Sequence, residues 1–158
     1  MPGRERAGAI VLNKKNQILL VERIKNGAHY FVIPGGGVKP GETYIDAAVR
    51  EVREETRIDV KAVREIYTLR PRDGPSDIRN NHHYIICEYI SGEPRLDDAS
   101  VERARMAEGK GNNEYFPQWM DTGRLPGTLV YPLEIRDWLI EDIPTGFRQT
   151  PREATIRL

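Results

Sequence analysis

The segment IPGGGVKPGETYIDAAVREVREETRI, residues 33–58, joins a glycine-rich turn to a helix that carries several acidic side chains. Apolar side chains recur in its second half with the spacing of a single buried helical stripe, which predicts a helix from about Thr43 to Thr56. We expect that stripe to face the protein core. Its members are Ile45, Ala48, Val49 and Val52.

The acidic residues of this helix form a second group. At about 100° per residue, Glu51, Glu54 and Glu55 lie within an arc of roughly 100° on another face. Neighbouring like charges destabilise a helix, and the helix dipole disfavours anions near its C-terminal end. We therefore expect something to compensate this negative charge.

A divalent cation is the simplest compensation, because magnesium, manganese and calcium prefer carboxylate oxygens and magnesium sites are often completed by phosphates and water. The alternative is a solvated, salt-bridged helix face on which Arg50 reaches Glu54. The helix alone leaves both interpretations open.

The glycines before the helix favour the metal site. Gly35, Gly36 and Gly37 follow an apolar extended segment, Tyr30 to Ile33, so the chain enters the turn from a strand. Glycines allow positive φ angles and close approach of a ligand, although they also suit a merely flexible loop. Together with the helix, they predict a strand, shaped loop and helix that bring a phosphate chain beside the carboxylates. We interpret this arrangement as a site for cleaving a phosphate ester or anhydride.

These residues resemble the signature of the Nudix hydrolase family, which spaces a glycine, an acidic residue and an Arg-Glu-x-x-Glu-Glu run in a fixed register. Arg57 departs from that signature, because the family usually has a helix-ending glycine there. A left-handed cap at Arg57 would cost about 1 kcal/mol, so the helix ends differently or accepts mild strain. The matching residues are Gly36, Glu42, Arg50, Glu51, Val52, Glu54, Glu55 and Ile58.

The resemblance implies an α/β (α+β) fold, an α/β/α sandwich with a mixed β-sheet. Residues 1–158 would form a single domain, with a flexible C-terminal tail from about residue 144. The sequence pattern agrees, because strands precede and follow one helix and a second helix comes late in the chain. We expect strands at Ala7 to Leu12, Gln17 to Ile24, Tyr30 to Ile33, Asp59 to Leu69, His82 to Ile90 and Tyr115 to Met120, and the second helix at Pro132 to Ile140.

The resemblance also implies roles for individual residues. Glu51, Glu54 and Glu55 would bind the metal, with the backbone carbonyl of Gly35 as a further ligand, and Mg²⁺ is the expected cofactor, with Mn²⁺ as an alternative. Arg50 would orient the carboxylates, and Glu42 would brace the loop against the helix. Gly36 and Gly37 would contact the substrate.

The general base is expected to be either Glu54 or Glu114, because family members use a signature glutamate or one from a later loop. Glu114 follows a glycine- and asparagine-rich segment that could close over a substrate, but exposed loop glutamates are more often only solvated. His82 and His83 are adjacent on a predicted strand and point to opposite faces, so we do not expect them to share a metal ion. Cys87 lies in an apolar strand and is expected to be an inert buried thiol.

Composition agrees with one soluble domain of 158 residues, with 39% apolar and 30% charged residues. Equal numbers of basic and acidic residues, 24 of each, give no general attraction to nucleic acid or to an anionic membrane. A local basic patch at Arg64, Arg70, Arg72 and Arg79 is an exception. One cysteine, no membrane-length apolar run and no signal-peptide pattern predict a cytoplasmic protein.

The function predicted from sequence is metal-dependent hydrolysis of the pyrophosphate bond of a nucleoside diphosphate derivative, by attack of water on phosphorus. A nucleotide sugar, an ADP-ribose-like compound or a (d)NTP would fit, and nucleic acid is not expected as a partner. A non-catalytic nucleotide-binding or regulatory domain is the main alternative, and a diphosphate isomerase is a third. The oligomeric state is left open between a monomer and a homodimer.

Overall fold

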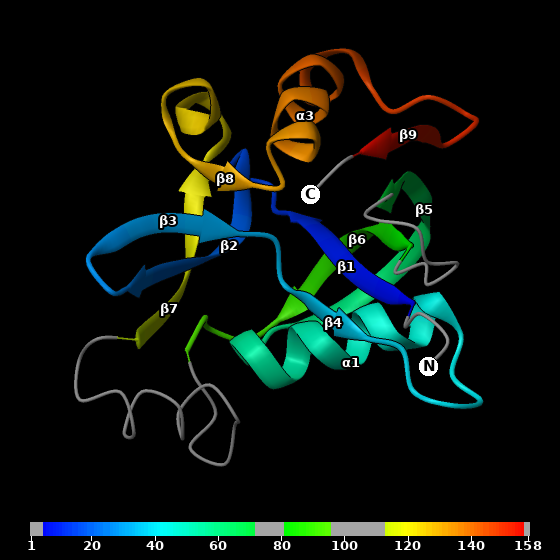
Figure 1. Ribbon diagram of the computed structural model, residues 1–158, viewed down its shortest axis with the longest axis horizontal. Helices are drawn as coiled ribbons and strands as arrows, with labels where there is room; N and C mark the ends of the chain where they lie inside the picture. The colour runs from blue at the N-terminus through cyan, green and yellow to red at the C-terminus, as the bar shows by residue number, and fades with distance from the viewer. Residues whose placement is uncertain (1–4, 72–80, 96–112, 157–158) are drawn as a thin grey trace.

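The computed structural model describes residues 5–71, 81–95 and 113–156 (Figure 1). Arg72 and Arg79 of the expected basic patch lie outside these residues. No helix within the described ranges is long and apolar enough to cross a lipid bilayer.

A single mixed sheet forms the centre of the protein. Its strand order is β8-β3-β2-β1-β6-β5-β9, with β4 paired to β1 and β7 paired to β2. The β1–β6, β3–β8 and β5–β9 pairs are parallel, and the other pairs are antiparallel. The strands are β1 (Arg6–Leu12), β2 (Gln17–Lys25), β3 (Ala28–Val32), β4 (Gly35–Gly37), β5 (Asp59–Pro71), β6 (His82–Ser91), β7 (Asn113–Asp121), β8 (Val130–Tyr131) and β9 (Arg152–Ile156).

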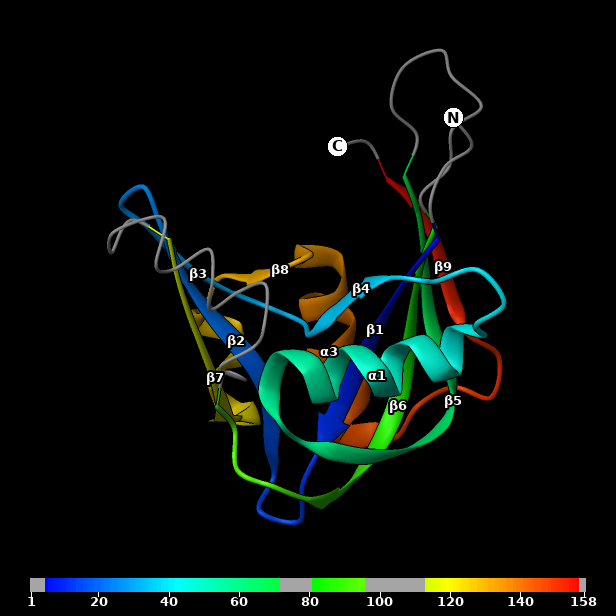
Figure 2. The same cartoon turned by 90° about the horizontal axis from the view of Figure 1, so that it is seen from below.

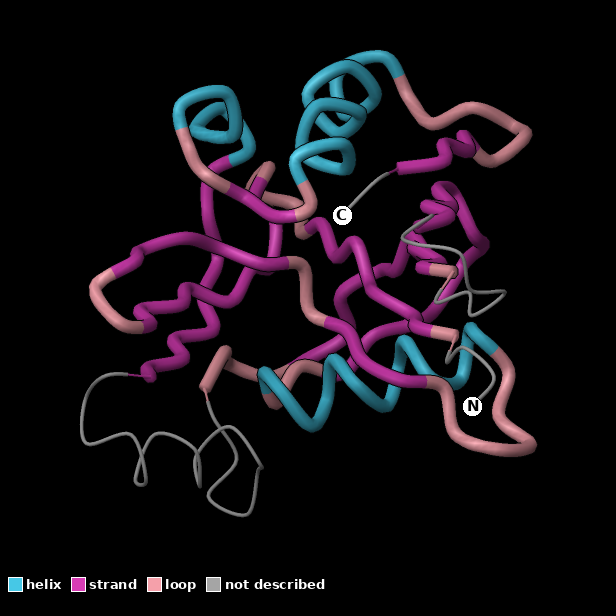
Figure 3. The backbone as a smooth tube through the Cα atoms, in the orientation of Figure 1, coloured by secondary structure: helices cyan, strands magenta, loops and turns pink. Residues whose placement is uncertain are grey.

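Two helices cover the two faces of the sheet. Helix α1 (Tyr44–Thr56) crosses β1, β6 and β5 on one face, and α3 (Leu133–Thr145) lies on the other (Figures 2 and 3). A short 3₁₀ helix, η1 (Thr122–Gly127), links β7 to β8. The predicted mixed sheet with helices on both faces is confirmed.

Strand β1 shows how the sequence serves both faces. Ala9 and Val11 pack in the core beneath α1, whereas Ile10 packs in the core beneath α3. Successive side chains on a strand point to opposite faces, so an uninterrupted apolar run is what a strand buried on both sides requires. All three residues are fully buried.

Helix α1 begins where the sequence predicts. The Thr43 hydroxyl accepts a hydrogen bond from the backbone N–H of Asp46 at 3.0 Å, which satisfies one of the unpaired donors of the first turn. The buried stripe differs from the prediction, because Ala47 is buried and Ile45 is 43% exposed. Ile45 lies in the first turn, whereas the small Ala47 and Ala48 let the helix approach the sheet closely.

The helix ends in the strained form that the sequence allowed. Arg57 has φ 66° and ψ 18°, the left-handed conformation, and its N–H donates to the Arg53 carbonyl at 3.0 Å. The chain thus uses the usual left-handed cap without the glycine that makes it strain-free.

The segment from residue 144 contributes more secondary structure than the sequence indicates. Helix α3 extends to Thr145, and residues 152–156 form β9, which pairs in parallel with Tyr67 to Pro71 of β5. The Asp142 carboxylate accepts hydrogen bonds from the Tyr67 hydroxyl at 2.7 Å and from Arg152 Nη2 at 2.8 Å. The tail expected from about residue 144 therefore includes a strand joined to the sheet, which a short, polar sequence did not reveal.

Replacing Arg57 tests the strain at the end of α1. We expect Arg57→Gly to be more stable than Arg57→Ala by about 1 kcal/mol, because both variants lose the side chain but only glycine adopts positive φ without cost. For a domain of this size the thermal midpoints should differ by about 2–4 °C. Urea and thermal unfolding measure the difference, and equal stabilities would contradict a strained cap.

Candidate functional site

A cavity of about 340 Å³ opens where β4 meets the C-terminal half of α1. It combines glycine backbone, two carboxylates, two guanidinium groups and an apolar wall. The lining residues are Arg6, Val21, Arg23, Val32, Ile33, Gly35, Gly36, Glu51, Glu55 and Tyr115.

The glycines are required by close contact rather than by positive φ. Residues 35–37 form the extended strand β4, not the loop expected from sequence, and none of them has a positive φ. A Cβ on Gly36 would lie 2.5 Å from the Glu51 carboxylate, and one on Gly35 would lie 2.5 Å from the Ala7 carbonyl oxygen. Bare backbone is the only way to fit the chain between β1 and the acidic face of α1.

The three glutamates of α1 differ in their environment because of their positions around the helix. Measured from the buried Ala48, Glu55 lies roughly 20° around the axis, Glu51 roughly 60° and Glu54 roughly 120°. Glu51 and Glu55 therefore line the cavity. The Glu54 side chain is 52% exposed, against 14% for Glu51.

Arg50 connects the helix to the glycine-rich segment. Its Nε and Nη2 donate to both oxygens of Glu42 at 2.8 and 2.9 Å, and Nη2 also donates to the Gly37 carbonyl at 3.0 Å. Its Nη1 donates to Glu51 at 2.9 Å and to Glu54 at 3.2 Å. The expected role of Arg50 in orienting carboxylates and of Glu42 in bracing the loop agrees with these contacts.

The pairing also sets the charge of Glu42. Hydrogen bonds from Arg50, and one from the Lys39 backbone N–H, lower the pKa of Glu42 from 4.5 to about 2. The same pairing raises the pKa of the Arg50 guanidinium. Both groups are charged at any physiological pH, so the brace between loop and helix is permanent.

Two of the three glutamates of α1, but not all three, are arranged to bind one hard cation in this structure. In the described ranges no three His, Cys, Asp or Glu side chains are gathered closely enough to hold an ion. Glu51 and Glu55 face one cavity, and Glu55 Oε2 accepts from the Gly35 N–H at 3.3 Å, so oxygen donors of the kind that Mg²⁺ prefers do converge there. Glu54 is held by Arg50, as the salt-bridge alternative foresaw, and its role as a ligand stays a prediction.

Glu114 is not among the residues that line the cavity. It lies on β7 opposite Ile24, one residue before Tyr115, whose side chain does line the cavity. Because neighbouring side chains on a strand alternate, Glu114 points to the other face of β7. The preceding residues Gly111 and Asn112 lie outside the described ranges.

Arg6 and Arg23 line the cavity but were not recognised from sequence. Arg6 is the first residue of β1 and Arg23 lies in the charged end of β2, so neither interrupts an apolar run and no local signal in the sequence identifies them. Tyr115, on the neighbouring strand β7, also lines the cavity.

Cys87 is buried, as expected from sequence, and the two neighbouring histidines lie in different surroundings. His83 lies between the carboxylates of Glu5 and Glu65, at 2.9 and 2.6 Å, and stacks on Tyr44 at a ring distance of 3.7 Å. His82 instead borders a small cavity next to the candidate site, with which it shares Gly35 and Gly36. Burial raises the pKa of the Cys87 thiol to about 12, so a thiolate nucleophile is not supported.

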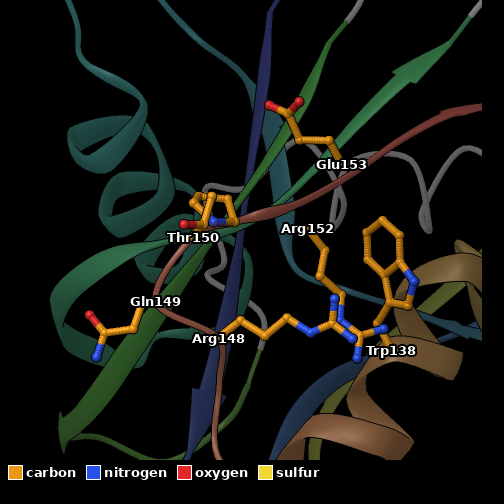
Figure 4. Close-up of a pocket in the computed structure, with 7 residues that line it drawn as sticks. Trp138, Arg148, Gln149, Thr150, Arg152 and Glu153 are labelled. Carbon is orange, nitrogen blue, oxygen red and sulfur yellow. The ribbon is translucent and has the colours of Figure 1, made fainter.

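A second, more open groove of about 630 Å³ lies between α3 and the segment leading into β9. Figure 4 shows Arg148 and Arg152 reaching toward Trp138 there. No residue of α1 or β4 lines this groove. It carries no carboxylate cluster comparable to that of α1, so the smaller cavity at β4 is the candidate site.

Comparison with known proteins agrees with the geometry. A family model described as the NUDIX domain matches residues 2–134. An RNA pyrophosphohydrolase from Pelagibacter ubique is 42% identical over 66 residues, which cover 41% of this chain and 42% of that protein. A putative 8-oxo-dGTP diphosphatase from Bacillus subtilis is 32% identical over 125 residues, which cover 78% of this chain and 70% of that protein. The first of these alignments thus spans less than half of the relative's length.

The fold has counterparts among solved structures. The crystal structure of a MutT NUDIX hydrolase from Burkholderia pseudomallei superimposes with a TM-score of 0.62, covering 86% of this chain and 96% of that one. Sequence identity is 22%, so this likeness concerns the fold alone.

Alanine substitutions in β4 test the close contact with β1 and α1. Gly35→Ala should lower the free energy of unfolding by about 1–3 kcal/mol, because its Cβ would meet the backbone of Ala7 and Gly8. Gly36→Ala should cost less, since the Glu51 carboxylate that it meets can move. Gly123→Ala, which meets nothing within 4 Å, is the control. Urea unfolding that shows Gly36→Ala to be less stable than Gly35→Ala would contradict this account.

The lowered pKa of Glu42 predicts a pH effect on stability. Because the folded protein favours the ionised carboxylate, Glu42 stabilises the fold above pH 4.5, and this contribution is lost as the pH falls from 4.5 toward 2. Urea midpoints at pH 7, 5, 4 and 3, measured in EDTA, should show wild type well above Glu42→Gln at pH 7 and a narrowing gap below pH 4.5. A gap independent of pH would contradict the assignment.

Proposed function

The chain belongs to the NUDIX domain family, and we propose that it is a divalent-metal-dependent hydrolase that cleaves the pyrophosphate bond of a nucleoside diphosphate derivative. One observation carries the proposal. Glu51 and Glu55 share a cavity with the bare backbone of Gly35 and Gly36, and Arg50 holds this arrangement together. Carboxylate oxygens and accessible backbone are the groups needed to hold a cation beside a phosphate chain.

The residues at this cavity fit a bound Mg²⁺ or Mn²⁺ by their chemistry. Glu51 and Glu55 would hold it, with Glu54 and the Gly35 carbonyl as further oxygen donors. When bound, a divalent ion neutralises the diphosphate and lowers the pKa of a coordinated water. The chain itself supplies the positions of these oxygens and, through Arg50, resists their mutual repulsion.

Glu54 is our candidate for the base that accepts the proton of the attacking water. Its carboxylate is half exposed, so a proton received there can pass to solvent, and Arg50 fixes it close to Glu51. Glu114 is the less supported candidate, because its side chain points away from the cavity.

The substrate class is inferred from the cavity and from the relatives. The relatives named RNA pyrophosphohydrolase and putative 8-oxo-dGTP diphosphatase differ in the substrate that they are named for, but both names describe cleavage of a phosphoanhydride. A cavity of about 340 Å³ is within the range of small-molecule sites. The balanced charge of the chain favours a small nucleotide substrate over a long polyanion.

A non-catalytic nucleotide-binding domain is the second candidate. It is favoured by one observation: within the described residues Glu51 and Glu54 pair with Arg50, and no cluster of three carboxylates is formed. The two candidates differ in turnover, which makes them easy to separate.

The test is an activity assay with Mg²⁺ or Mn²⁺ and a panel of (d)NTPs, nucleotide sugars and ADP-ribose, scoring released monophosphate. We expect turnover of some of these compounds, and a loss of about 100-fold or more in kcat for Glu51→Gln and Glu55→Gln. Glu88→Gln, which removes an exposed charge on β6, is the matched control and should keep full activity. Nucleotide binding without turnover would support the binding domain instead.

Glu54→Gln separates a base from a ligand. If Glu54 is the base, kcat falls while the metal concentration needed for half-maximal activity stays near that of wild type. A shift of the metal requirement instead would make Glu54 a ligand.

A further inference from the structure

The part of the cavity formed by β2, β3 and β7 is built around Arg23. This residue lies on β2 opposite Tyr30 of β3 and Tyr115 of β7, and the three strands lie side by side (Figure 2). Its guanidinium carbon lies 3.8 Å from the centre of the Tyr115 ring and 6.0 Å from that of Tyr30. A cation at this distance from an aromatic face is held in place by the ring quadrupole.

Among the described residues, few acceptors pair with the donors of Arg23. Its one hydrogen bond to the described residues runs from Nη2 to Asn113 Oδ1 at 2.6 Å. Its Nε is buried and contacts no acceptor in the described part of the chain. An unsatisfied buried N–H costs free energy, so a ligand acceptor that reached the Arg23 guanidinium would supply a hydrogen bond that these residues do not.

The surroundings of Arg23 favour a flat ring over a phosphate. Val21, Val32 and Tyr115 form a small apolar cluster, separate from the two cores of the sheet, that walls this part of the cavity. A phosphate would lose its hydration against that wall, whereas a base would bury apolar ring surface there. Arg6 is the cation that we assign to the phosphates. It lines the same cavity and lies opposite Gly37 in the β1–β4 ladder, beside the carboxylates of α1.

We propose that Arg23 recognises the base of the nucleotide and selects a 6-oxopurine by donating hydrogen bonds to its O6 and N7 atoms. This inference rests on the proposed function, because it takes the carboxylate end of the cavity as the place of the phosphates. A guanidinium only donates, and a 6-oxopurine presents two neighbouring acceptors on this edge. Adenine presents one acceptor and an amino group, whose hydrogens would face the hydrogens of Arg23.

Inosine and adenosine nucleotides form the matched pair of ligands, because they differ only in the group at position 6 of the purine and in the proton that the 6-oxo form carries on N1. We expect calorimetric titration in EDTA to give about 5- to 100-fold tighter binding of IMP than of AMP by wild type. Under Mg²⁺, the ratio of kcat/KM for ITP over ATP should favour ITP in the same sense, through KM more than through kcat.

Two variants of Arg23 make the prediction specific. Arg23→Lys keeps the charge but loses the planar fork, so the preference for IMP should fall to within about twofold. Arg23→Gln presents an amide that can pair with the N6 and N7 atoms of adenine, so it should shift the preference toward AMP. Arg124→Lys on η1 is the control and should keep the wild-type preference. Thermal unfolding of each variant establishes that it is folded.

The outcomes separate this inference from the proposed function. Turnover of no nucleotide would refute the hydrolase, while the comparison of IMP with AMP would still decide the role of Arg23. Turnover with equal efficiency for ITP and ATP, or an unchanged preference in both Arg23 variants, would overturn base recognition and leave the hydrolase standing. Binding of inorganic pyrophosphate can be measured by the same titration. If Arg23→Lys lost this binding but kept the preference for IMP, Arg23 would be a phosphate contact, and base recognition would again be overturned.

Discussion

The guanidinium of Arg50 is the interaction on which the candidate site depends. It is shared between Glu42 and the Gly37 carbonyl on the loop side and Glu51 and Glu54 on the helix side. Without it, negative charges would crowd the end of a helix whose dipole already disfavours them. With it, the acidic face of α1 packs directly against β4. A Cβ on Gly36 would clash with the Glu51 carboxylate, so this packing requires glycine there. Charge pairing and steric fit therefore act together, and each would fail without the other.

Much of this could be read from the sequence because the signals are local. The period of α1, the Thr43 cap and the spacing of the glycines and glutamates are relations between residues near one another in the chain, and they predict the helix, its start and the acidic face. The strands β1, β2 and β6 were equally clear, since apolar runs of that length suit a sheet buried on both sides. The strained cap at Arg57 was one of two foreseen endings.

The parts that sequence did not reveal depend on contacts between distant segments. Gly35 to Gly37 form a strand because they can pair with β1. Residues 152–156 form β9 because they can pair with the edge of β5. Helix α1 turns Ala47 and Ala48 toward the sheet, which lets it pack closely, and this orientation leaves Ile45 exposed. The pairing of Arg23 with Tyr115 joins residues far apart in the chain, and no local pattern points to it.

The position of β9 has a consequence for the synthesis of the protein. Until residues 152–156 have left the ribosome, the part of β5 from Tyr67 to Pro71 has an unpaired edge, and the carboxylate of Asp142 lacks its partner Arg152. Free strand edges are templates for association with other chains. The nascent chain therefore exposes this strand edge until β9 has been synthesised, and a chaperone bound there would cover it in the meantime.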